Sequence, residues 1–431
     1  MAVQIVRDPA SRLTRSVFLR PSPNGRRRGR VRGLIQLGAV LAALSGFTSS
    51  AAIAGQDFAR WLADLRLEAR GQGISQATLD TALGSVKPIA RVIELDRRQP
   101  EFTQTFWSYL DRAVSAERVA TGRRLLAKHA ALLQKVELRY GVQPRFLVAI
   151  WGLESDYGKV TGGFPVIGAL ATLAHDKRRS AFFRAELLQS LRIIDQGHIT
   201  AARMTGSWAG AMGQVQFMPS TFTGYAVDGD GDGRRDIWHS LPDAFASAAN
   251  FLRALSWQGD KTWGREVRLP SDFDWELNGL DQVKTLAGWQ ALGVRRAGGG
   301  DLPRVEVSGS IVLPAGHAGP AFLVYQNYRS TLGWNRSHLY AIAVGHLADR
   351  IAGGGPFLST RPADDRPLSR TEMKEIQSRL AALGFDPGPI DGVMGSGSRA
   401  ALKAYQRSAK QPPDGYPTAR LLDELRQARQ P

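Results

Sequence analysis

Residues 151–158 read Trp-Gly-Leu-Glu-Ser-Asp-Tyr-Gly and end a segment, 142–158, that is mostly apolar. Pro144 suits the first turn of a helix, and Gly158 suits the position just beyond its end. The segment therefore predicts a largely buried helix with Glu154 near its C-terminal end. A carboxyl group among Trp, Leu and Tyr side chains loses hydration, which raises its pKa and allows it to donate a proton near neutral pH.

Glu154 alone does not establish a catalytic site, because a Glu in the last turn of a helix usually faces solvent. Asp156 lies on another face of such a helix and fits a turn or cap better than a catalytic partner. The sequence contains no His-Glu-x-x-His and no Gly-x-Ser-x-Gly, and its seven histidines lack the spacing of metal ligands. These observations argue against a zinc hydrolase and a serine hydrolase.

A second group of residues, Gly206-Ser-Trp-Ala-Gly-Ala-Met-Gly-Gln-Val-Gln-Phe-Met-Pro-Ser220, combines small residues with Gln, Ser, Trp and Phe. Small residues allow a ligand to approach the backbone, and amides, hydroxyls and aromatic faces can recognise sugar rings. A tight loop that packs helices together is the alternative interpretation.

The length of 431 residues predicts two or three domains. Apolar residues at helical spacing from Asp57 to about Leu138 predict helices. Between about Glu266 and Val312 the pattern loosens, and the β-like pieces 305–307 and 310–313 predict a small sheet or loop insertion. A helical pattern returns from Phe322 to Ile351. We therefore expect a mainly α catalytic domain over residues 55–352.

Gly and Pro residues over 353–368 predict a linker before a small C-terminal module, residues 369–431. Ser369 and Glu372 form a capping-box sequence at the start of a helix, and Gly384 fits its end. Two further apolar patterns, around Leu402 and Leu422, predict a three-helix domain.

The N-terminal 54 residues have the composition of a signal peptide. They hold nine Arg and one Asp, followed by an uncharged run from Gly33 to Ala54 that ends in Ala52-Ile53-Ala54. An N-terminal membrane anchor is the alternative, although the apolar run is short for a spanning helix. We expect a periplasmic protein without a lipid anchor, because the chain has no cysteine.

Several motifs in order resemble the membrane-bound lytic transglycosylase B family of peptidoglycan-cleaving enzymes. They are Trp151-Gly-Leu-Glu154-Ser, Ala209-Gly-Ala-Met-Gly-Gln-Val-Gln216-Phe-Met-Pro-Ser, Asp243-Ala-Phe-Ala-Ser-Ala-Ala-Asn250-Phe251-Leu, Asn327-Tyr328, Trp334-Asn-Arg-Ser337 and Tyr340-Ala-Ile-Ala-Val-Gly-His-Leu-Ala-Asp349. The C-terminal module, with Ile390-Asp-Gly-Val-Met-Gly395 and Ala400-Ala-Leu-Lys-Ala-Tyr-Gln406, resembles peptidoglycan-binding domain 1.

The resemblance implies a lysozyme-like helical domain in which Glu154 is the sole catalytic acid and base. It implies a glycan cleft lined by Ser207, Gln216, Phe217, Asn250 and Trp334; Phe251 and Trp334 stand where many relatives carry Tyr. The implied reaction cleaves the bond between N-acetylmuramic acid and N-acetylglucosamine, gives a 1,6-anhydro product and needs no cofactor. A hydrolysing muramidase, which needs a second carboxylate, and a non-catalytic wall-binding protein remain alternatives.

The segment Asp228-Gly-Asp-Gly-Asp-Gly-Arg-Arg-Asp236 matches the first half of an EF-hand calcium loop, with acidic residues at alternate positions and Gly233 at the sixth. His239 occupies the twelfth position, where calcium loops carry Glu. The expected ligands are Asp228, Asp230, Asp232, the Arg234 carbonyl and, by the resemblance, Asp243. The bound Ca²⁺ would be structural. The alternative is a solvated turn.

The net charge is +17, of which +9 lies beyond the leader, and it fits an anionic partner. Peptidoglycan with its peptide carboxylates is such a partner. Basic residues do not cluster with aromatic residues in a nucleic-acid-binding module, so we expect no nucleic acid. We expect a monomer that acts on glycan strands, alone or within cell-wall enzyme complexes.

Overall fold

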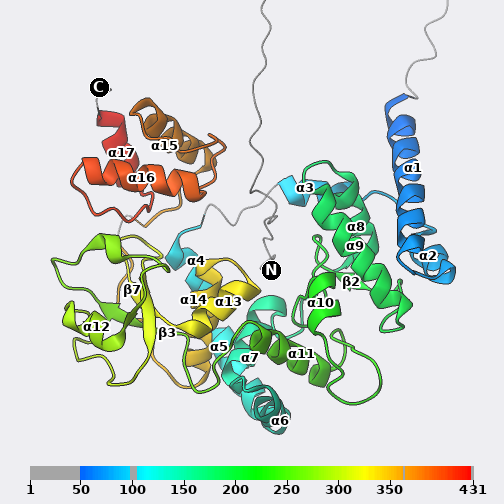
Figure 1. The fold of residues 1–431 in the computed structure, drawn as a ribbon, viewed down its shortest axis with the longest axis horizontal. Helices are drawn as coiled ribbons and strands as arrows, with labels where there is room; N and C mark the ends of the chain where they lie inside the picture. The colour runs from blue at the N-terminus through cyan, green and yellow to red at the C-terminus, as the bar shows by residue number, and fades with distance from the viewer. Residues whose placement is uncertain (1–48, 98–103, 363–364, 429–431) are drawn as a thin grey trace, which may run out of the picture. The chain divides into compact units, whose positions relative to one another are not determined.

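The computed structural model describes residues 49–97, 104–362 and 365–428 (Figure 1). Most of the predicted leader lies outside these residues, so the signal peptide stays a prediction. Helix α1, Ser49–Gly71, crosses the predicted cleavage position. It belongs to a separate unit and is described by itself. Among the described residues, no helix is both long and apolar enough to span a membrane.

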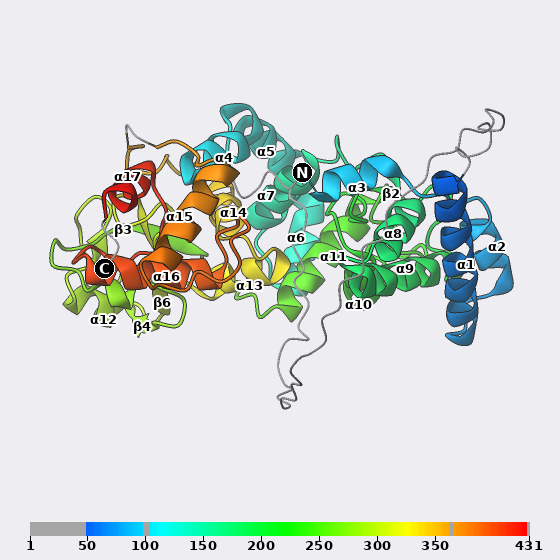
Figure 2. The same cartoon turned by 90° about the horizontal axis from the view of Figure 1, so that it is seen from above.

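The catalytic region is helical, as predicted. Its helices before the sheet insertion are α2 (Gln76–Leu83), α3 (Ala90–Arg97), α4 (Phe106–Ala113), α5 (Ala116–Lys128), α6 (Ala130–Tyr140), α7 (Pro144–Ser155), α8 (Val166–His175), α9 (Ser180–Asp195), α10 (Pro219–Tyr225) and α11 (Leu241–Ala254). Ser75, Thr105 and Ser115 cap the N-termini of α2, α4 and α5. Helices α8 and α9 lie side by side, with α10 against α9 (Figures 1 and 2).

Helix α7 is the central element of this region. It contacts α5, α6, α11 and α14, and residues 146–152 are buried without interruption. A helix that is apolar on all sides is stable only inside a domain, which explains why other helices surround it. Two short strands, β1 (Phe164–Pro165) and β2 (Thr205–Gly206), pair antiparallel beside α8.

The insertion is a small antiparallel sheet, as predicted, in the order β4-β6-β7-β3-β5. The strands are β3 (Gly264–Arg268), β4 (Lys284–Thr285), β5 (Arg295–Arg296), β6 (Ser308–Val312) and β7 (Ala321–Val324). Ile311 pairs with Leu323, and Val267 with Ala321. Trp289 of α12 (Leu286–Ala291) is fully buried in the core beneath this sheet.

Two boundaries of the insertion differ from the prediction. Residues 305–307 are not a strand, and β6 begins at Ser308. The segment from Phe322 to Val324 is a strand rather than the start of a helix. Its residues are buried on both faces of the sheet, so they form an apolar run without the period-two alternation of a half-exposed strand. The helices follow as α13 (Gln326–Trp334) and α14 (His338–Ile351).

The C-terminal module has the predicted three helices, α15 (Arg370–Ala382), α16 (Ser396–Ser408) and α17 (Ala419–Gln427). Both hydrogen bonds of the capping box are present: the Ser369 hydroxyl accepts the Glu372 amide, and the Glu372 carboxylate accepts the Ser369 amide. Ile376, Leu380, Leu402 and Leu422 are fully buried in one shared core.

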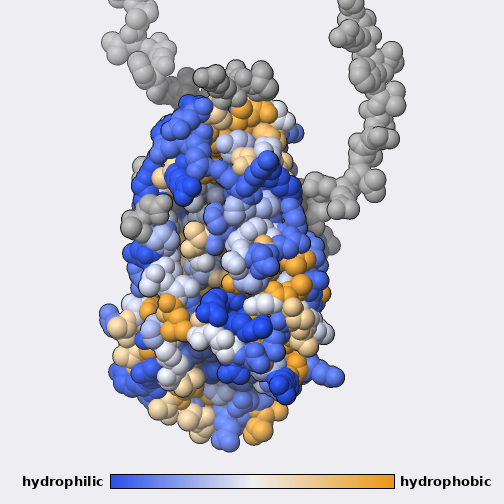
Figure 3. Space-filling view, turned by 90° about the vertical axis from the view of Figure 1, so that its left-hand side faces the viewer, coloured by the Kyte–Doolittle hydropathy of each residue, from blue (hydrophilic) through white to orange (hydrophobic). Residues whose placement is uncertain are grey.

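On the face drawn in Figure 3, hydrophobic residues occur in small groups among hydrophilic ones.

Candidate active site

Glu154 occupies the last turn of α7, where Pro144 begins the helix and Ser155 ends it. Asp156 is the C-cap in the left-handed conformation, as a turn residue should be, and Gly158 follows with φ 83°. The side chain of Asp156 lies 3.7 Å from Arg118 and 3.4 Å from Lys159. Asp156 therefore acts as a helix cap at the protein surface. Glu154, by contrast, is only 2% exposed.

Two hydrogen bonds hold the Glu154 carboxyl group, and both reach the same oxygen. The Trp334 indole donates to Oε1 at 2.9 Å, and the Tyr340 hydroxyl donates to Oε1 at 2.5 Å. No described residue donates a hydrogen bond to Oε2. These two bonds therefore fix the carboxyl group through Oε1.

Burial raises the pKa of Glu154 to about 7, and the hydrogen bonds from Tyr340 and Trp334 limit this rise by favouring the charged form. Burial and the neighbouring carboxylate also raise the pKa of Tyr340, so its hydroxyl remains a donor at neutral pH. At neutral pH, Glu154 therefore exists in both protonation states, which suits a group that must first release and then regain a proton.

Aromatic side chains pack around the indole that contacts Glu154. Phe217 and Phe251 lie 5.3 Å and 5.2 Å from Trp334 between ring centroids, and 5.6 Å from each other. Tyr225 extends the group, with its ring 4.7 Å from Phe251. The structure therefore brings Glu154, Phe217 and Trp334 together, although they lie far apart in the sequence.

The other predicted cleft residues make contacts within the protein. Gln216 has φ 49° and donates from Nε2 to the carbonyl oxygens of Thr161 and Gly213, each at 2.9 Å. The Ser207 hydroxyl accepts the Ala211 amide at 3.0 Å, and Asn250 donates to the Tyr225 carbonyl at 2.9 Å. These bonds shape the loop before Phe217 and the aromatic group; direct contacts of these residues with a glycan stay predictions.

Sequence reasoning did not assign a role to Tyr340, although it is one of the two donors to Glu154. The available signal was a single hydroxyl on the buried, apolar surface of α14, where Tyr340 is fully buried. A buried Tyr hydroxyl needs a hydrogen-bond partner. That argument could have predicted a polar partner for Tyr340, but it could not have identified Glu154 as that partner.

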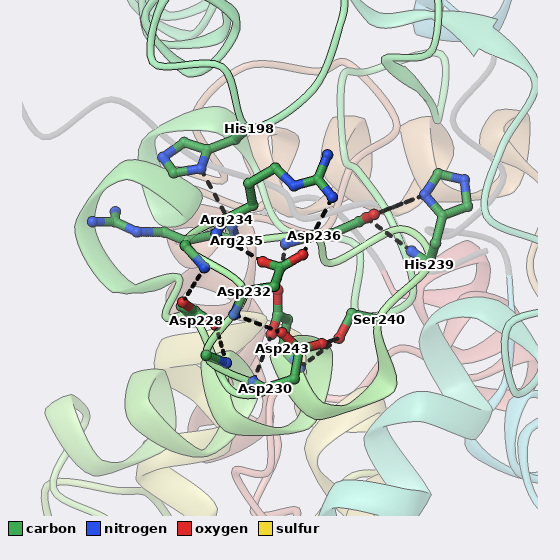
Figure 4. A network of polar contacts seen from close by, with 12 residues as sticks. His198, Asp228, Asp230, Asp232, Arg234, Arg235, Asp236, His239, Ser240 and Asp243 are labelled. Atoms are coloured by element: carbon green, nitrogen blue, oxygen red, sulfur yellow. Dashed lines mark hydrogen bonds and ion pairs between the residues drawn. The ribbon is translucent and has the colours of Figure 1, made fainter.

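The segment 228–236, called the acidic loop from here on, brings three predicted ligands together. One carboxylate oxygen each of Asp228, Asp230 and Asp232 lies within 4.8 Å of the others, and two of these residues are exposed (Figure 4). Gly231 and Gly233 donate their amides to Asp228, which lowers the pKa of that carboxyl. Three hard, charged oxygens at this spacing fit Ca²⁺.

Asp243 is not part of this carboxylate group. It is fully buried, and its oxygens accept the amides of Gly229 at 2.7 Å, Asp230 at 3.3 Å and Asp236 at 2.5 Å (Figure 4). Asp243 thus anchors the loop to α11, and its role as a calcium ligand stays a prediction. The sequence places Asp243 near the loop but cannot show that backbone amides occupy both of its oxygens.

A mainly helical domain that buries one Glu beside a Trp and raises its pKa has the general-acid arrangement of lysozyme. A model of the transglycosylase SLT domain matches residues 57–349, and a peptidoglycan-binding domain model matches residues 369–425. The chain belongs to the transglycosylase SLT family and is a lytic transglycosylase that cleaves peptidoglycan.

Similar proteins include SltB3 from Pseudomonas aeruginosa, whose structure was solved with NAG-anhNAM-pentapeptide. It is 49% identical over 86% of this chain and 100% of its own, with a TM-score of 0.83. Membrane-bound lytic murein transglycosylase B of Escherichia coli K12 is 29% identical over 65% of this chain and 79% of its own. Escherichia coli Slt35, solved with calcium, is 26% identical over 69% of this chain and 92% of its own, with a TM-score of 0.58.

Proposed function

We propose that this lytic transglycosylase uses Glu154 as its only acid and base. It would cleave the β-1,4 bond between N-acetylmuramic acid and N-acetylglucosamine and leave a 1,6-anhydromuramyl end. The observation that carries this proposal is the carboxyl group itself, which is 2% exposed, bonded at Oε1 by Trp334 and Tyr340, and shifted in pKa to about 7.

In the first step, protonated Glu154 transfers its proton to the bridging oxygen, and the bond between that oxygen and the muramyl C1 breaks. The N-acetylglucosamine part leaves as an alcohol. The carboxylate formed in this step keeps its two hydrogen bonds at Oε1, which stabilise the new negative charge.

In the second step, the muramyl C6 hydroxyl attacks C1 and gives its proton to the Glu154 carboxylate. The new C6–O–C1 bond forms the anhydro ring, and Glu154 returns to its starting state without consuming water. A hydrolase would need a second carboxylate to activate water or to bind C1. The nearest acid in the sequence, Asp156, is instead the helix cap beside Arg118 and Lys159.

Mass analysis of fragments released from peptidoglycan sacculi tests this reaction. We expect muramyl ends that are lighter by one water molecule than reducing ends. Reducing muramyl ends would instead support the hydrolysing alternative.

Trp334→Phe should shift the pH dependence of kcat. The variant keeps an aromatic ring beside Phe217 but removes the donor to Glu154, so the charged form loses a hydrogen bond and the pKa of Glu154 rises. Activity requires protonated Glu154, so it declines above this pKa, and the alkaline limb should move up by about one pH unit. Initial rates measured from acid to alkaline pH give this limb.

Trp257→Phe is the matched control, because the Trp257 indole donates to Gln143 instead. Its alkaline limb should coincide with that of the wild type. An unchanged limb in Trp334→Phe, or a shift to lower pH, would contradict the proposed role of the indole.

We also propose that the acidic loop binds one structural Ca²⁺ through Asp228, Asp230, Asp232, the Arg234 carbonyl and Asp243. The three clustered carboxylates support it, and Slt35 was solved with calcium. Calorimetric titration should show one site in the wild type and none in Asp230→Ala. Calcium at 100 times its Kd should stabilise the wild type by about 2.7 kcal/mol.

Asp301→Ala provides the control for this titration, because Asp301 is a surface residue paired with Arg295. It should bind calcium like the wild type. Equal heats from Asp230→Ala and the wild type would reject the loop as the site.

The C-terminal module would keep the enzyme on the peptidoglycan while the catalytic domain cleaves it. We place the mature protein in the periplasm on the basis of the N-terminal leader composition. We infer that it acts there as a monomer. Loss of sacculus binding in a chain ending before Ser369 would support the role of the module; unchanged binding would contradict it.

A further inference from the structure

We propose that Gln214 is a positioning residue for Glu154: it fastens the last turn of α7 to the segment that closes the acidic loop. This inference rests on the proposed role of Glu154. The motif that contains Gln214 was assigned to the glycan cleft, but the side chain of Gln214 points to another part of the structure. Its contacts are with the helix that carries the catalytic carboxyl group.

Gln214 holds α7 on both sides of Glu154. The Trp151 indole donates to the Gln214 side-chain oxygen at 2.7 Å, and the Ser155 hydroxyl donates to the Gln214 carbonyl at 2.6 Å. Trp151 precedes Glu154 by three residues and Ser155 follows it, so the two contacts lie on either side of Glu154, about one helical turn apart. This part of α7 is therefore bonded to Gln214 at two positions.

The opposite side of Gln214 is bonded to the segment after the acidic loop. Its backbone amide donates to the Ile237 carbonyl at 2.9 Å, and its side-chain nitrogen donates to the Trp238 carbonyl at 3.1 Å. The side-chain amide thus accepts from α7 with its oxygen and donates to the loop segment with its nitrogen. A side chain with only one of these functions could not make both bonds.

A glycine makes the space for this amide. Gly158 has φ 83°, and a Cβ atom at this position would lie 2.2 Å from Oε1 of Gln214. Any larger residue would displace the amide oxygen that accepts the Trp151 bond. The glycine that follows α7 therefore permits the close approach of Gln214, in addition to its left-handed backbone.

The loop that carries Gln214 reaches Glu154 by a second route. Met212 and Phe217 form an antiparallel bridge at the base of this loop. Phe217 packs against Trp334, which donates to Glu154. Gln214 therefore fixes the loop relative to α7, and the same loop supports one of the two donors to the carboxyl group.

The test compares Gln214→Met, Trp151→Phe and the double variant. Methionine fills a similar volume without the amide, and Trp151→Phe removes the indole donor while keeping a buried ring. We expect kcat to fall about tenfold in each single variant, since small displacements of a catalytic group reduce rates strongly. KM should change less than twofold. The loss of kcat in the double variant should not exceed the larger of the two single losses, because both substitutions break the same bond.

The alkaline limb of the kcat profile separates positioning from general destabilisation. If the turn of Glu154 shifts, its bonds from Trp334 and Tyr340 lengthen, and the limb should move to higher pH. A purely structural role would lower the melting temperature and leave the limb in place. Gln258→Met, a matched substitution at an exposed position, should leave kcat and the limb unchanged.

Glu154→Gln belongs in the same assay, because it separates failure of this inference from failure of the proposed function. An active Glu154→Gln would reject Glu154 as the acid and base. An inactive Glu154→Gln together with wild-type kcat and limb in Gln214→Met would reject only the role of Gln214. Additive losses in the double variant would also reject it.

Discussion

Glu154→Gln is expected to lower kcat by at least about a thousandfold, because one residue supplies both proton transfers and each is worth roughly 10² to 10⁴ in rate. Glutamine has nearly the same shape, and its amide oxygen can still accept from Trp334 and Tyr340. The variant therefore resembles the protonated enzyme but has no proton to transfer. The release of soluble fragments from sacculi measures this loss.

Glu137→Gln is the matched control, since Glu137 lies partly exposed on α6. It should release fragments at the wild-type rate. If Glu154→Gln kept more than a tenth of the wild-type rate, another residue would have to supply the acid.

The same substitution should stabilise the folded protein at alkaline pH. Glu154 has a folded-state pKa of about 7 against an ordinary value of 4.5, so the folded state holds its proton more tightly than the unfolded state. The wild type therefore loses stability as the pH rises from 4.5 through about 7. The loss reaches about 3 kcal/mol above this range, because one pKa unit corresponds to about 1.4 kcal/mol.

Glutamine does not ionise and avoids this loss. Urea unfolding at about pH 8 should show Glu154→Gln more stable than the wild type by about 3 kcal/mol, with the difference falling to a few tenths near pH 4.5. Glu137→Gln should follow the wild type at both pH values. A difference that does not depend on pH would contradict the buried, protonated carboxyl group.

Local sequence determined much of the fold in advance. Pro144 and the apolar run after it predict the buried helix, and Ser369 with Glu372 predicts the capped start of the C-terminal module; both features are present. Strand β7 was predicted as helix, because a short apolar run fits either a buried strand or a buried helix. Its pairing with β3 and β6 decides between them.

The environment of Glu154 could be predicted only in part. Its apolar neighbours in the sequence indicate desolvation, but its hydrogen-bond donors come from 180 and 186 residues further along the chain. Gln214 shows the same limit, because its motif indicates a loop but not the direction of its amide. Contacts between distant segments depend on packing, which one sequence does not specify residue by residue.

The acidic loop separates local from tertiary information in a similar way. The alternate spacing of Asp228, Asp230 and Asp232 predicts that these carboxylates converge, and the structure brings them together. Asp243 lies in the following helix, and its position relative to the loop follows from how α11 packs. It anchors backbone amides there, and the ligand role that the family resemblance implies stays a prediction.

The titration of Glu154 itself tests the central claim most directly. Infrared difference spectra between the wild type and Glu154→Gln isolate the carbonyl stretch of this one carboxylic acid as the pH is raised. A midpoint near 7 would confirm a proton held in the buried site at neutral pH. A midpoint near the ordinary value of 4.5 would contradict the account, because the carboxyl group would already be ionised where the enzyme must donate its proton.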